Sequence, residues 1–581
     1  MNDAPAPSTA FAAALLTAFL DAGVRELVVA PGSRSQALAL VAAELDRAGR
    51  ARLRVRVDER DAAFLALGLG KESGRPAVVI TTSGTAVANL HPAVLEARHS
   101  GVPMIVLTAD RPEELRGIGS NQTTDHVGIL AGTVARTFDV GAPTGEPGED
   151  ESARSLARDA TAAAAHGPVH VNVAFTEPLS SPWTASPVAE RAERDDETSR
   201  SSPGPFVSPA ARSGTEDRRT LRPGRRTAVL AGAGAGESAE QVARELGAVL
   251  FAEVASGAHF GPQLVVPYRA VIRDEAFLDG LERLVVFGHP TLSREAPWLV
   301  ERAASSGVDV LVVRTPGVEA YNPGHSVTEF ADAVEVQGSV NAVSARSWYG
   351  PWVAASRAFL ERTEDVPTDV HAAAREKARN ELAAVRAEVT RRALVDAVWR
   401  ATWPHDRLVV AASRLIRELD RFAPGKRVAV HANRGLAGID GTISTAVGVA
   451  LGSGAVTRLL TGDLAFLHDV GGLAFGKGEE RPRVLVIVGN DGGGTIFDDL
   501  EVADGRAPSG ASAGEAEASS GADGDSLTAY DRVMLTPQTA SIESLAGAYG
   551  WEYRRVEQRG DLDSAISACT GPTVVEVPLA R

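Results

Sequence analysis

The chain has 581 residues, 44% of them hydrophobic, which at about 100–200 residues per domain predicts three or four packed domains. Lys and Arg total 59 against 75 Asp and Glu, and the net charge of −16 argues against nucleic acid or an anionic membrane as the main partner. The one cysteine, Cys569, cannot form an intrachain disulfide, and no export or membrane segment is recognisable, so we expect a cytoplasmic protein.

Short apolar strands alternate with helices through the first 185 residues. Strands are expected at residues 25–30, 53–57, 76–81, 102–107 and 169–173. This alternation predicts a doubly wound α/β domain over residues 1–185. Ligands of such sheets bind beyond the carboxyl ends of the strands. The sequence places Glu59 at one of these ends and the small residues 82–86 at another, close to a helix N-terminus.

A linker and a middle domain are expected next. Residues 186–226 are rich in Pro, Ser, Glu, Asp and Arg without apolar periodicity, which is typical of a linker. A second α/β block follows over residues 227–365, with strands expected at 227–231, 248–251, 283–287 and 308–313. Its first strand leads into a GAGAG run, but Glu237 stands where a G-x-G-x-x-G motif has its third glycine. We therefore expect a Rossmann-like middle domain without a nucleotide.

The last block, residues 366–581, contains two strand ends that carry oxygen ligands. One apolar strand leads into Gly462-Asp463, and another, at 484–488, leads into Asn490-Asp491 and three glycines. These groups suit a magnesium ion that carries a diphosphate, although two ordinary strand-to-helix turns fit the same residues. The acidic, Gly/Ser/Ala-rich stretch 499–530 is predicted to be a mobile loop. With a strand at 573–577, the block predicts a sheet similar to the first one.

These strand ends also carry a family resemblance. Asp463, followed 28 positions later (491 − 463) by Asp491, resembles the metal-binding motif of thiamine-diphosphate enzymes. More narrowly, several blocks in order resemble the 2-succinyl-5-enolpyruvyl-6-hydroxy-3-cyclohexene-1-carboxylate synthase family. They are PGSRS at 31–35, VDER at 57–60, TSGTAVANL at 82–90, TADRP at 108–112, NQT at 121–123, NRGLAGIDGTIST at 433–445 and GGGTIF at 492–497. The blocks span both end domains, and the middle domain carries no comparable signature.

The resemblance implies a transferase of menaquinone biosynthesis. Such an enzyme uses thiamine diphosphate and Mg²⁺ or Mn²⁺ to decarboxylate 2-oxoglutarate, and adds the resulting succinyl-semialdehyde carbanion to isochorismate. It also implies three domains of the thiamine-diphosphate enzyme type. The expected assembly is a homodimer or homotetramer whose active sites combine the domain of Glu59 from one subunit with the domain of Asp463 from another.

The resemblance further implies roles for individual residues at the cofactor. Glu59 is the expected catalytic residue, since a carboxylate bound to N1′ of the aminopyrimidine stabilises its imino form, although the bare motif also fits a helix-start glutamate favoured by the macrodipole. Ile439 is expected to bend the cofactor as an apolar wedge. The full set of expected cofactor residues is Glu59, Ser83, Gly84, Ile439, Gly462, Asp463, Leu464, Asp491 and Ile496.

The register of the metal ligands is open by one residue. Alignment on Ile496-Phe497 gives Asp463, Asp491 and the carbonyl of Gly493, whereas alignment on Asp463 gives Asn490 and the carbonyl of Gly492 instead. We prefer the first, because the loop around 476–483 tolerates a change of length better than a coordination shell does.

Both implied substrates are dianions, and arginine matches carboxylates in a bidentate way. By resemblance, Ser413, Arg417 and Arg434 receive the part derived from 2-oxoglutarate. The residues expected around isochorismate are Ser33, Arg34, Arg111, Asn121 and Gln122, and Phe497 is expected to line an apolar wall with Ile496.

Two other classes of function remain open at this point. One is another thiamine-diphosphate enzyme, such as an acetohydroxyacid synthase or a pyruvate oxidase with FAD in the middle domain. The arginine-rich set and the incomplete glycine motif disfavour it. The other is a non-catalytic, nucleotide-binding regulatory protein built on the middle domain.

Overall fold

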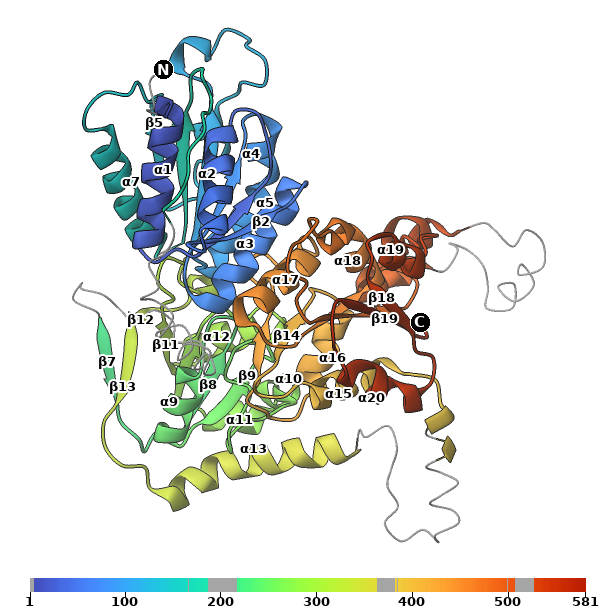
Figure 1. Ribbon diagram of the computed structural model, residues 1–581. Helices are drawn as coiled ribbons and strands as arrows, with labels where there is room; N and C mark the ends of the chain where they lie inside the picture. Colours follow the sequence, from blue (N-terminus) through green and yellow to red (C-terminus); the bar gives the residue numbers. More distant parts are fainter. Residues whose placement is uncertain are drawn as a thin grey trace.

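The computed structural model describes residues 5–165, 167–186, 217–362, 382–383, 385–498, 500–506 and 527–581. Three parallel sheets flanked by helices follow one another along the chain, which confirms the predicted α/β class (Figure 1). No helix within these residues combines the length and the apolar character needed to cross a bilayer. The exact domain boundaries at 185, 226 and 365 stay predictions.

The N-terminal unit is a six-stranded parallel sheet with strand order β2-β1-β3-β4-β6-β5. Helices α1, α2 and α7 share one apolar core with the sheet, and α3 and α5 share another. Strand β5 is absent from the sequence prediction because its residues are only partly buried and form no apolar run. The elements are α1 (Pro7–Asp21), β1 (Glu26–Val29), α2 (Gln36–Arg47), β2 (Arg52–Val55), α3 (Glu59–Ser73), β3 (Ala77–Thr81), α4 (Thr85–Asn89), α5 (His91–Ser100), β4 (Met104–Asp110), α6 (His126–Ile129), β5 (Arg136–Val140), α7 (Glu149–Ala164) and β6 (Pro168–Ala174).

The middle unit is a five-stranded sheet with order β12-β11-β10-β8-β9, beside a two-stranded sheet of β7 and β13. Strand β7 lies inside the expected linker 186–226, so the linker prediction is wrong for its four residues. Its polar sequence RRTL has no apolar pattern, and pairing with β13 is what makes it a strand. The elements are β7 (Arg218–Leu221), β8 (Thr227–Ala231), α9 (Ser238–Leu246), β9 (Val249–Ala252), α10 (Tyr268–Ile272), α11 (Glu275–Gly280), β10 (Arg283–Phe287), α12 (Glu295–Ser305), β11 (Asp309–Val313), β12 (Glu329–Ala331), β13 (Ala333–Val336) and α13 (Ala342–Arg362).

The C-terminal unit repeats the topology of the first. Its sheet has order β15-β14-β16-β17-β19-β18, so both end sheets follow the sequence 2-1-3-4-6-5, and the expectation of two similar sheets is confirmed. In each, the first and third strands are neighbours and the chain turns outward from them, which creates a ligand crevice at their carboxyl ends. The elements are α15 (Arg391–Ala401), β14 (Arg407–Val410), α16 (Arg414–Phe422), β15 (Ala429–His431), α17 (Thr442–Ser453), β16 (Thr457–Gly462), α18 (Asp463–His468), β17 (Val484–Asn490), η5 (Thr495–Phe497), η6 (Glu501–Arg506), η7 (Asp531–Leu535), α19 (Ile542–Ala548), β18 (Glu552–Arg555), α20 (Arg559–Ser567) and β19 (Thr573–Pro578).

The two end units meet through α3 and α17, which lie side by side in Figure 1. A Cβ added to Gly68 would lie 2.2 Å from the carbonyl oxygen of Thr445, and one on Gly448 would lie 2.3 Å from that of Leu65. The two helices therefore touch backbone to backbone, where only glycine fits. Residues of both units contribute to a single apolar cluster around this crossing.

Candidate active site

The turns that follow β1 and β3 pack against each other at the switch point of the N-terminal sheet. A Cβ on Gly32 would lie 2.3 Å from the Cβ of Thr82, so only glycine permits this approach. Ser33 in the first turn is exposed, and the guanidinium of Arg34 donates to the carbonyl oxygen of Phe175 at 2.9 Å. The predicted residues of both turns thus share one edge of the sheet.

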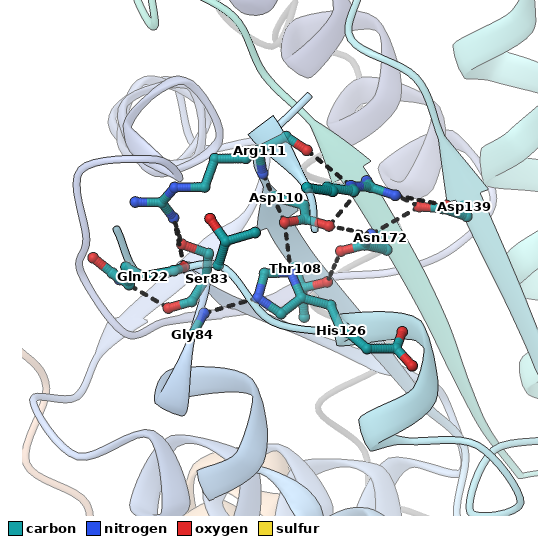
Figure 2. A network of polar contacts seen from close by, with 12 residues as sticks. Ser83, Gly84, Thr108, Asp110, Arg111, Gln122, His126, Asp139 and Asn172 are labelled. Carbon is teal, nitrogen blue, oxygen red and sulfur yellow. Dashed lines mark hydrogen bonds and ion pairs between the residues drawn. The ribbon is translucent and has the colours of Figure 1, made fainter. Parts of the chain in front are cut away.

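Arg111, directly after β4, links these turns to the loop that contains Gln122 (Figure 2). Its guanidinium donates to the hydroxyl of Ser83 and, at 2.9 Å, to the carbonyl oxygen of Gln122. The Gln122 amide donates to the carbonyl oxygen of Ser83 at 2.8 Å. Burial lowers the pKa of Arg111, and the positive charge of Arg34 lowers it further. Two guanidinium groups therefore lie close enough to interact electrostatically, near the exposed Asn121.

The buried His126 holds the turn that carries Gly84, as Figure 2 shows. The N–H of Gly84 donates to Nε2 of His126 at 2.8 Å, which makes Nε2 an acceptor and leaves the proton on Nδ1. Nδ1 lies 2.8 Å from Oδ1 of Asp110. Burial alone would raise the pKa of Asp110, but contacts with His126 and Asn172 hold it below its ordinary value. The charged Asp110 thus keeps the imidazole in the tautomer that Gly84 needs.

Glu59 is the first residue of α3, where Asp58 caps the helix by accepting a hydrogen bond from the N–H of Arg60 at 2.8 Å. Glu59 is half-buried, and among the described residues its carboxylate accepts one hydrogen bond, from Nδ2 of Asn89 at 3.4 Å. Within the described part of one chain, no hydrogen bond or ion pair joins it to the predicted cofactor residues of the C-terminal unit. Val57, two residues earlier, has 89% of its surface exposed.

Asp463 and Asp491 lie at the carboxyl ends of two neighbouring strands, β16 and β17, whose last paired residues are Gly462 and Gly489. Burial, together with the negative charge of Asp491, raises the pKa of Asp463 to about 6, against hydrogen bonds from main-chain N–H groups that include that of Leu464. The two carboxylates are therefore close enough to interact electrostatically.

The two candidate side-chain ligands of the metal, Asn490 and Asp491, differ in their hydrogen bonds. Asn490 donates from Nδ2 to Oε1 of Glu576 at 2.7 Å, and its Oδ1 accepts from the N–H of Gly492 at 3.2 Å. Asp491 accepts three hydrogen bonds on Oδ2, whereas Oδ1 accepts none from the described residues. Both side chains are thus held by the protein, Asn490 through its amide nitrogen and oxygen and Asp491 through one of its two oxygens.

Gly493 occupies a position that only glycine can take. Its φ is +137°, and a Cβ would lie 2.1 Å from the carbonyl oxygen of Leu535. The N–H of Gly494 donates to the same carbonyl oxygen at 2.7 Å. The glycine run is therefore fixed in place by η7, next to Asp491.

The predicted residues for 2-oxoglutarate come from two segments of the C-terminal unit. Ser413 caps α16, with Oγ accepting from the N–H of Leu415 at 3.2 Å, and Arg417 is exposed on the following turn. Arg434 is 9% exposed, and its NH2 nitrogen donates to both oxygens of Thr291 at 2.9 Å. The middle unit therefore holds an arginine that the C-terminal unit supplies.

The predicted apolar residues lie around the same edge. Ile439 is half-buried in the loop before α17, where Gly441 packs on the ring of Phe64. Leu464 is half-buried on α18, and Ile496 and Phe497 are half-buried in η5.

The stretch 499–530 departs from the expected loop at both ends. Residues 501–506 form η6, and at the other end Tyr530 is buried, with its hydroxyl donating to Oδ1 of Asp498 at 3.0 Å. The sequence did not predict these ordered ends, because neither shows a periodic pattern of apolar residues. Residues 507–526 lie outside the described part of the chain.

Comparison with known proteins decides the family. A family model described as thiamine pyrophosphate enzyme, N-terminal TPP binding domain, matches residues 10–129. The chain is 51% identical to a protein of Leifsonia xyli subsp. xyli and 54% identical to one of Clavibacter michiganensis subsp. michiganensis, each over 99% of this chain and 97% of the relative. A protein of Arthrobacter sp. (strain FB24) is 39% identical over 97% of this chain and 88% of its own. All three carry the same name, 2-succinyl-5-enolpyruvyl-6-hydroxy-3-cyclohexene-1-carboxylate synthase.

The chain belongs to the 2-succinyl-5-enolpyruvyl-6-hydroxy-3-cyclohexene-1-carboxylate synthase family. It is therefore an enzyme, and its cofactor is thiamine diphosphate. The family expected from the sequence blocks is confirmed.

The C-terminal edge of this synthase fits a metal that carries a diphosphate. Among the described residues, no three His, Cys, Asp or Glu side chains come together, so side chains alone would not complete the coordination of an ion here. An ion between Asp463 and Asp491 must thus take further oxygens from the main chain and from the cofactor, as a diphosphate-bound Mg²⁺ does.

Sequence reasoning missed the residues that orient this site. His126, Thr291 and Arg391 each hold a predicted site residue, and all three lie outside the recognised blocks. Only His126 had a signal nearby, since it follows the NQT block at 121–123.

Proposed function

We propose that this enzyme decarboxylates 2-oxoglutarate and adds the remaining four-carbon unit to isochorismate, a step of menaquinone biosynthesis that yields the product in the family's name. The observation that carries the proposal is the placement of arginines at the carboxyl edges of both end sheets. Arg34 and Arg111 lie at one edge, and Arg417 and Arg434 in the other unit. Two substrates with two carboxylates each require such separate cationic groups.

We further propose that Mg²⁺ or Mn²⁺ binds to Asp463, Asp491 and the carbonyl oxygen of Gly493. The supporting observations are the mutual repulsion of the two carboxylates and the unbonded Oδ1 of Asp491 among the described residues. When bound, thiamine diphosphate would supply a nucleophilic carbon for the keto group and a sink for the electron pair left by CO₂.

The chain's own residues orient and activate the cofactor in this proposal. Glu59 would hold the proton at N1′ of the aminopyrimidine, and Ile439 would keep the two rings of the cofactor bent. Ser83 and Gly84 would face the same ring from the turn that His126 holds. Gly462 and Leu464 would flank the diphosphate next to Asp463, and Ile496 would line the cofactor.

The substrate residues divide by unit. Ser413, Arg417 and Arg434 would bind the carboxylates of 2-oxoglutarate. Phe497 would close an apolar wall above them. The residues proposed to surround isochorismate are Ser33, Arg34, Arg111, Asn121 and Gln122.

A homodimer or homotetramer with shared sites is also part of the proposal. Two observations support it: Glu59 has only Asn89 as a hydrogen-bonding partner among the described residues, and Val57 beside it is exposed. A second subunit would cover this edge. The middle unit is proposed to bind no nucleotide, because a Cβ on Gly232 would lie 2.0 Å from the backbone nitrogen of Pro290, so close backbone packing explains a glycine there.

A two-substrate assay tests the function. Purified protein is mixed with 2-oxoglutarate and isochorismate, and CO₂ release and isochorismate loss are measured with thiamine diphosphate and Mg²⁺ added or withheld. Both signals should require the cofactor and the metal, and Asp463→Ala should abolish both. Equal CO₂ release from pyruvate, or flavin absorbance in the purified protein, would favour an acetohydroxyacid synthase or pyruvate oxidase instead.

A further inference from the structure

Arg391, the first residue of α15, forms an ion pair with Asp491 at the proposed metal site. Its Nε and NH2 nitrogens lie 3.2 and 2.9 Å from Oδ2 of Asp491. The side chains are 14% and 10% exposed, so the pair is largely shielded from water. A shielded, charge-assisted pair of this kind fixes the orientation of a carboxylate far better than a surface pair does.

The three donors all bind the same oxygen. Thr495 donates from Oγ1 to Oδ2 of Asp491 at 2.5 Å, in addition to the two bonds from Arg391. Oδ1 accepts no hydrogen bond from the described residues, so it is the atom left to bind a cation. The protein thus divides the two oxygens of one carboxylate between a fixed hydrogen-bonding role and a ligand role.

The net charge of the ion pair between Asp491 and Arg391 also affects the proposed metal site. An aspartate ligand carries one more negative charge than an asparagine ligand, and here it stands beside Asp463 and a diphosphate. Asp491 and Arg391 together are formally neutral, as an asparagine is. The ion pair therefore provides an oxygen ligand of fixed orientation without adding net negative charge near the diphosphate.

We propose that Arg391 is a positioning residue whose guanidinium orients and neutralises Asp491 so that Oδ1 can bind the divalent ion. The inference rests on the proposed function, because it assigns the ion to Asp463 and Asp491. It predicts that the identities of residues 391 and 491 are coupled: either can be replaced without loss only when the other is replaced with it.

The test measures binding of Mn²⁺ in the presence of thiamine diphosphate, by calorimetry and by the electron paramagnetic resonance signal of free Mn²⁺. Arg391→Gln should weaken Mn²⁺ binding by about 10- to 100-fold, the usual effect of removing a partner that orients a metal ligand. Asp491→Asn should weaken it too, since Arg391 is then left beside the ion as an unpaired positive charge. The double variant should recover most of the loss. In it, the glutamine carbonyl at position 391 can accept from the asparagine NH₂ at position 491 and leave the asparagine oxygen for the ion.

Arg392→Gln is the matched control. Arg392 lies one residue further along α15 but pairs with Asp396 at 2.6 Å, so its replacement removes the same charge without touching Asp491. It should bind Mn²⁺ as wild type does. Circular dichroism of every variant reports whether the fold is intact.

Each outcome is decisive. Unchanged or tighter binding in Arg391→Gln would overturn the inference, and tighter binding would mean that the guanidinium competes with the ion. Absence of rescue in the double variant would overturn it as well. If wild type binds no Mn²⁺ with the cofactor present, the metal site of the proposed function fails first; if wild type binds and only the coupling is missing, the proposed function stands and this inference does not.

Discussion

Lys71 and Glu96 form a buried ion pair, with Nζ of Lys71 3.5 Å from Oε1 of Glu96. Both side chains bind the main chain of the segment that carries Arg434. Lys71 donates to the carbonyl oxygen of Ala432 at 2.7 Å, and the two carboxylate oxygens of Glu96 accept from the N–H groups of residues 435–436 at 2.9 and 2.8 Å. Both partners belong to the N-terminal unit and the segment to the C-terminal one. The position of a proposed substrate arginine is therefore set by a neighbouring unit.

Glu96→Gln should weaken the use of 2-oxoglutarate. The amide has one acceptor oxygen where the carboxylate has two, so one main-chain N–H next to Arg434 loses its partner. Losing about 1.4 kcal/mol in this way corresponds to a roughly tenfold rise in the KM for 2-oxoglutarate. Glu44→Gln, at the surface of α2, is the control. A lower melting temperature with an unchanged KM would show that the contacts of Glu96 with residues 435–436 contribute to stability alone.

Glu59→Gln should leave folding and cofactor binding nearly intact and remove most turnover. The amide keeps the shape of the side chain but has no carboxylate to stabilise the imino form of the cofactor. Acid–base groups usually contribute about 10²- to 10⁴-fold. Steady-state rates and calorimetric binding of thiamine diphosphate give the two readings. Turnover within about threefold of wild type, against that range, would remove Glu59 from the mechanism.

Mixing two inactive variants should restore activity if sites are shared. Glu59→Gln subunits have an intact Asp463, and Asp463→Ala subunits have an intact Glu59. Mixed oligomers should therefore contain some sites with neither lesion, and the recovered rate should rise with the time allowed for exchange. Mixed oligomers that form, as seen by native mass spectrometry, but recover no activity would contradict the shared-site proposal.

The arginines of the two units should affect different half-reactions. Losing a charge-assisted contact costs roughly 1.5–3 kcal/mol, or about 10- to 150-fold. Arg417→Ala should slow CO₂ release from 2-oxoglutarate with an artificial electron acceptor by that order. Arg111→Ala should spare this half-reaction and impair addition to isochorismate. Equal slowing of CO₂ release by both variants would refute the division into two substrate regions.

A buried pair of carboxyl groups predicts a pH-dependent stability. Burial raises the pKa of Asp61 to about 6, and burial together with the charge of Asp61 raises the pKa of Asp469 well above its ordinary value. The folded state thus binds more protons than the unfolded state, so this stabilisation is present at low pH and, for Asp61, is lost as the pH rises from about 4 to about 6.

Asp469→Asn tests this pair. The amide can still accept from the N–H of Ser444, as Asp469 does at 2.9 Å, and donates to Asp61 at any pH. The variant should melt at a higher temperature than wild type at pH 8 and at nearly the same temperature at about pH 4, the lower end of this range. A constant difference between the two proteins across this range would show that the pair does not titrate there.

The strand ends could be predicted from sequence because they depend on local patterns. Asp463 and Asp491 follow apolar strands directly, and parallel strands bring their carboxyl ends together, so their proximity follows from the pattern alone. The roles of these and the other site residues remain predictions.

What could not be predicted depends on contacts between distant segments. Thr291 is 143 positions from Arg434, and Arg391 is 100 positions from Asp491. Strand β7 could not be predicted for a similar reason. Its sequence is polar, and its pairing partner β13 lies more than 100 residues away along the chain. Local periodicity contains no information on such pairs.

The contact between Tyr530 and Asp498 has a consequence for how this family can diversify. The hydroxyl-to-carboxylate bond of 3.0 Å, together with the packing of Leu535 under Gly493, brings both ends of the 499–530 stretch to the same spot. Each doubling of the length of a closed loop costs only about 0.6 kcal/mol of chain entropy. With its two stems pinned side by side, the intervening segment can gain or lose residues, or receive a reporter group, without moving the glycine run beside the metal ligands.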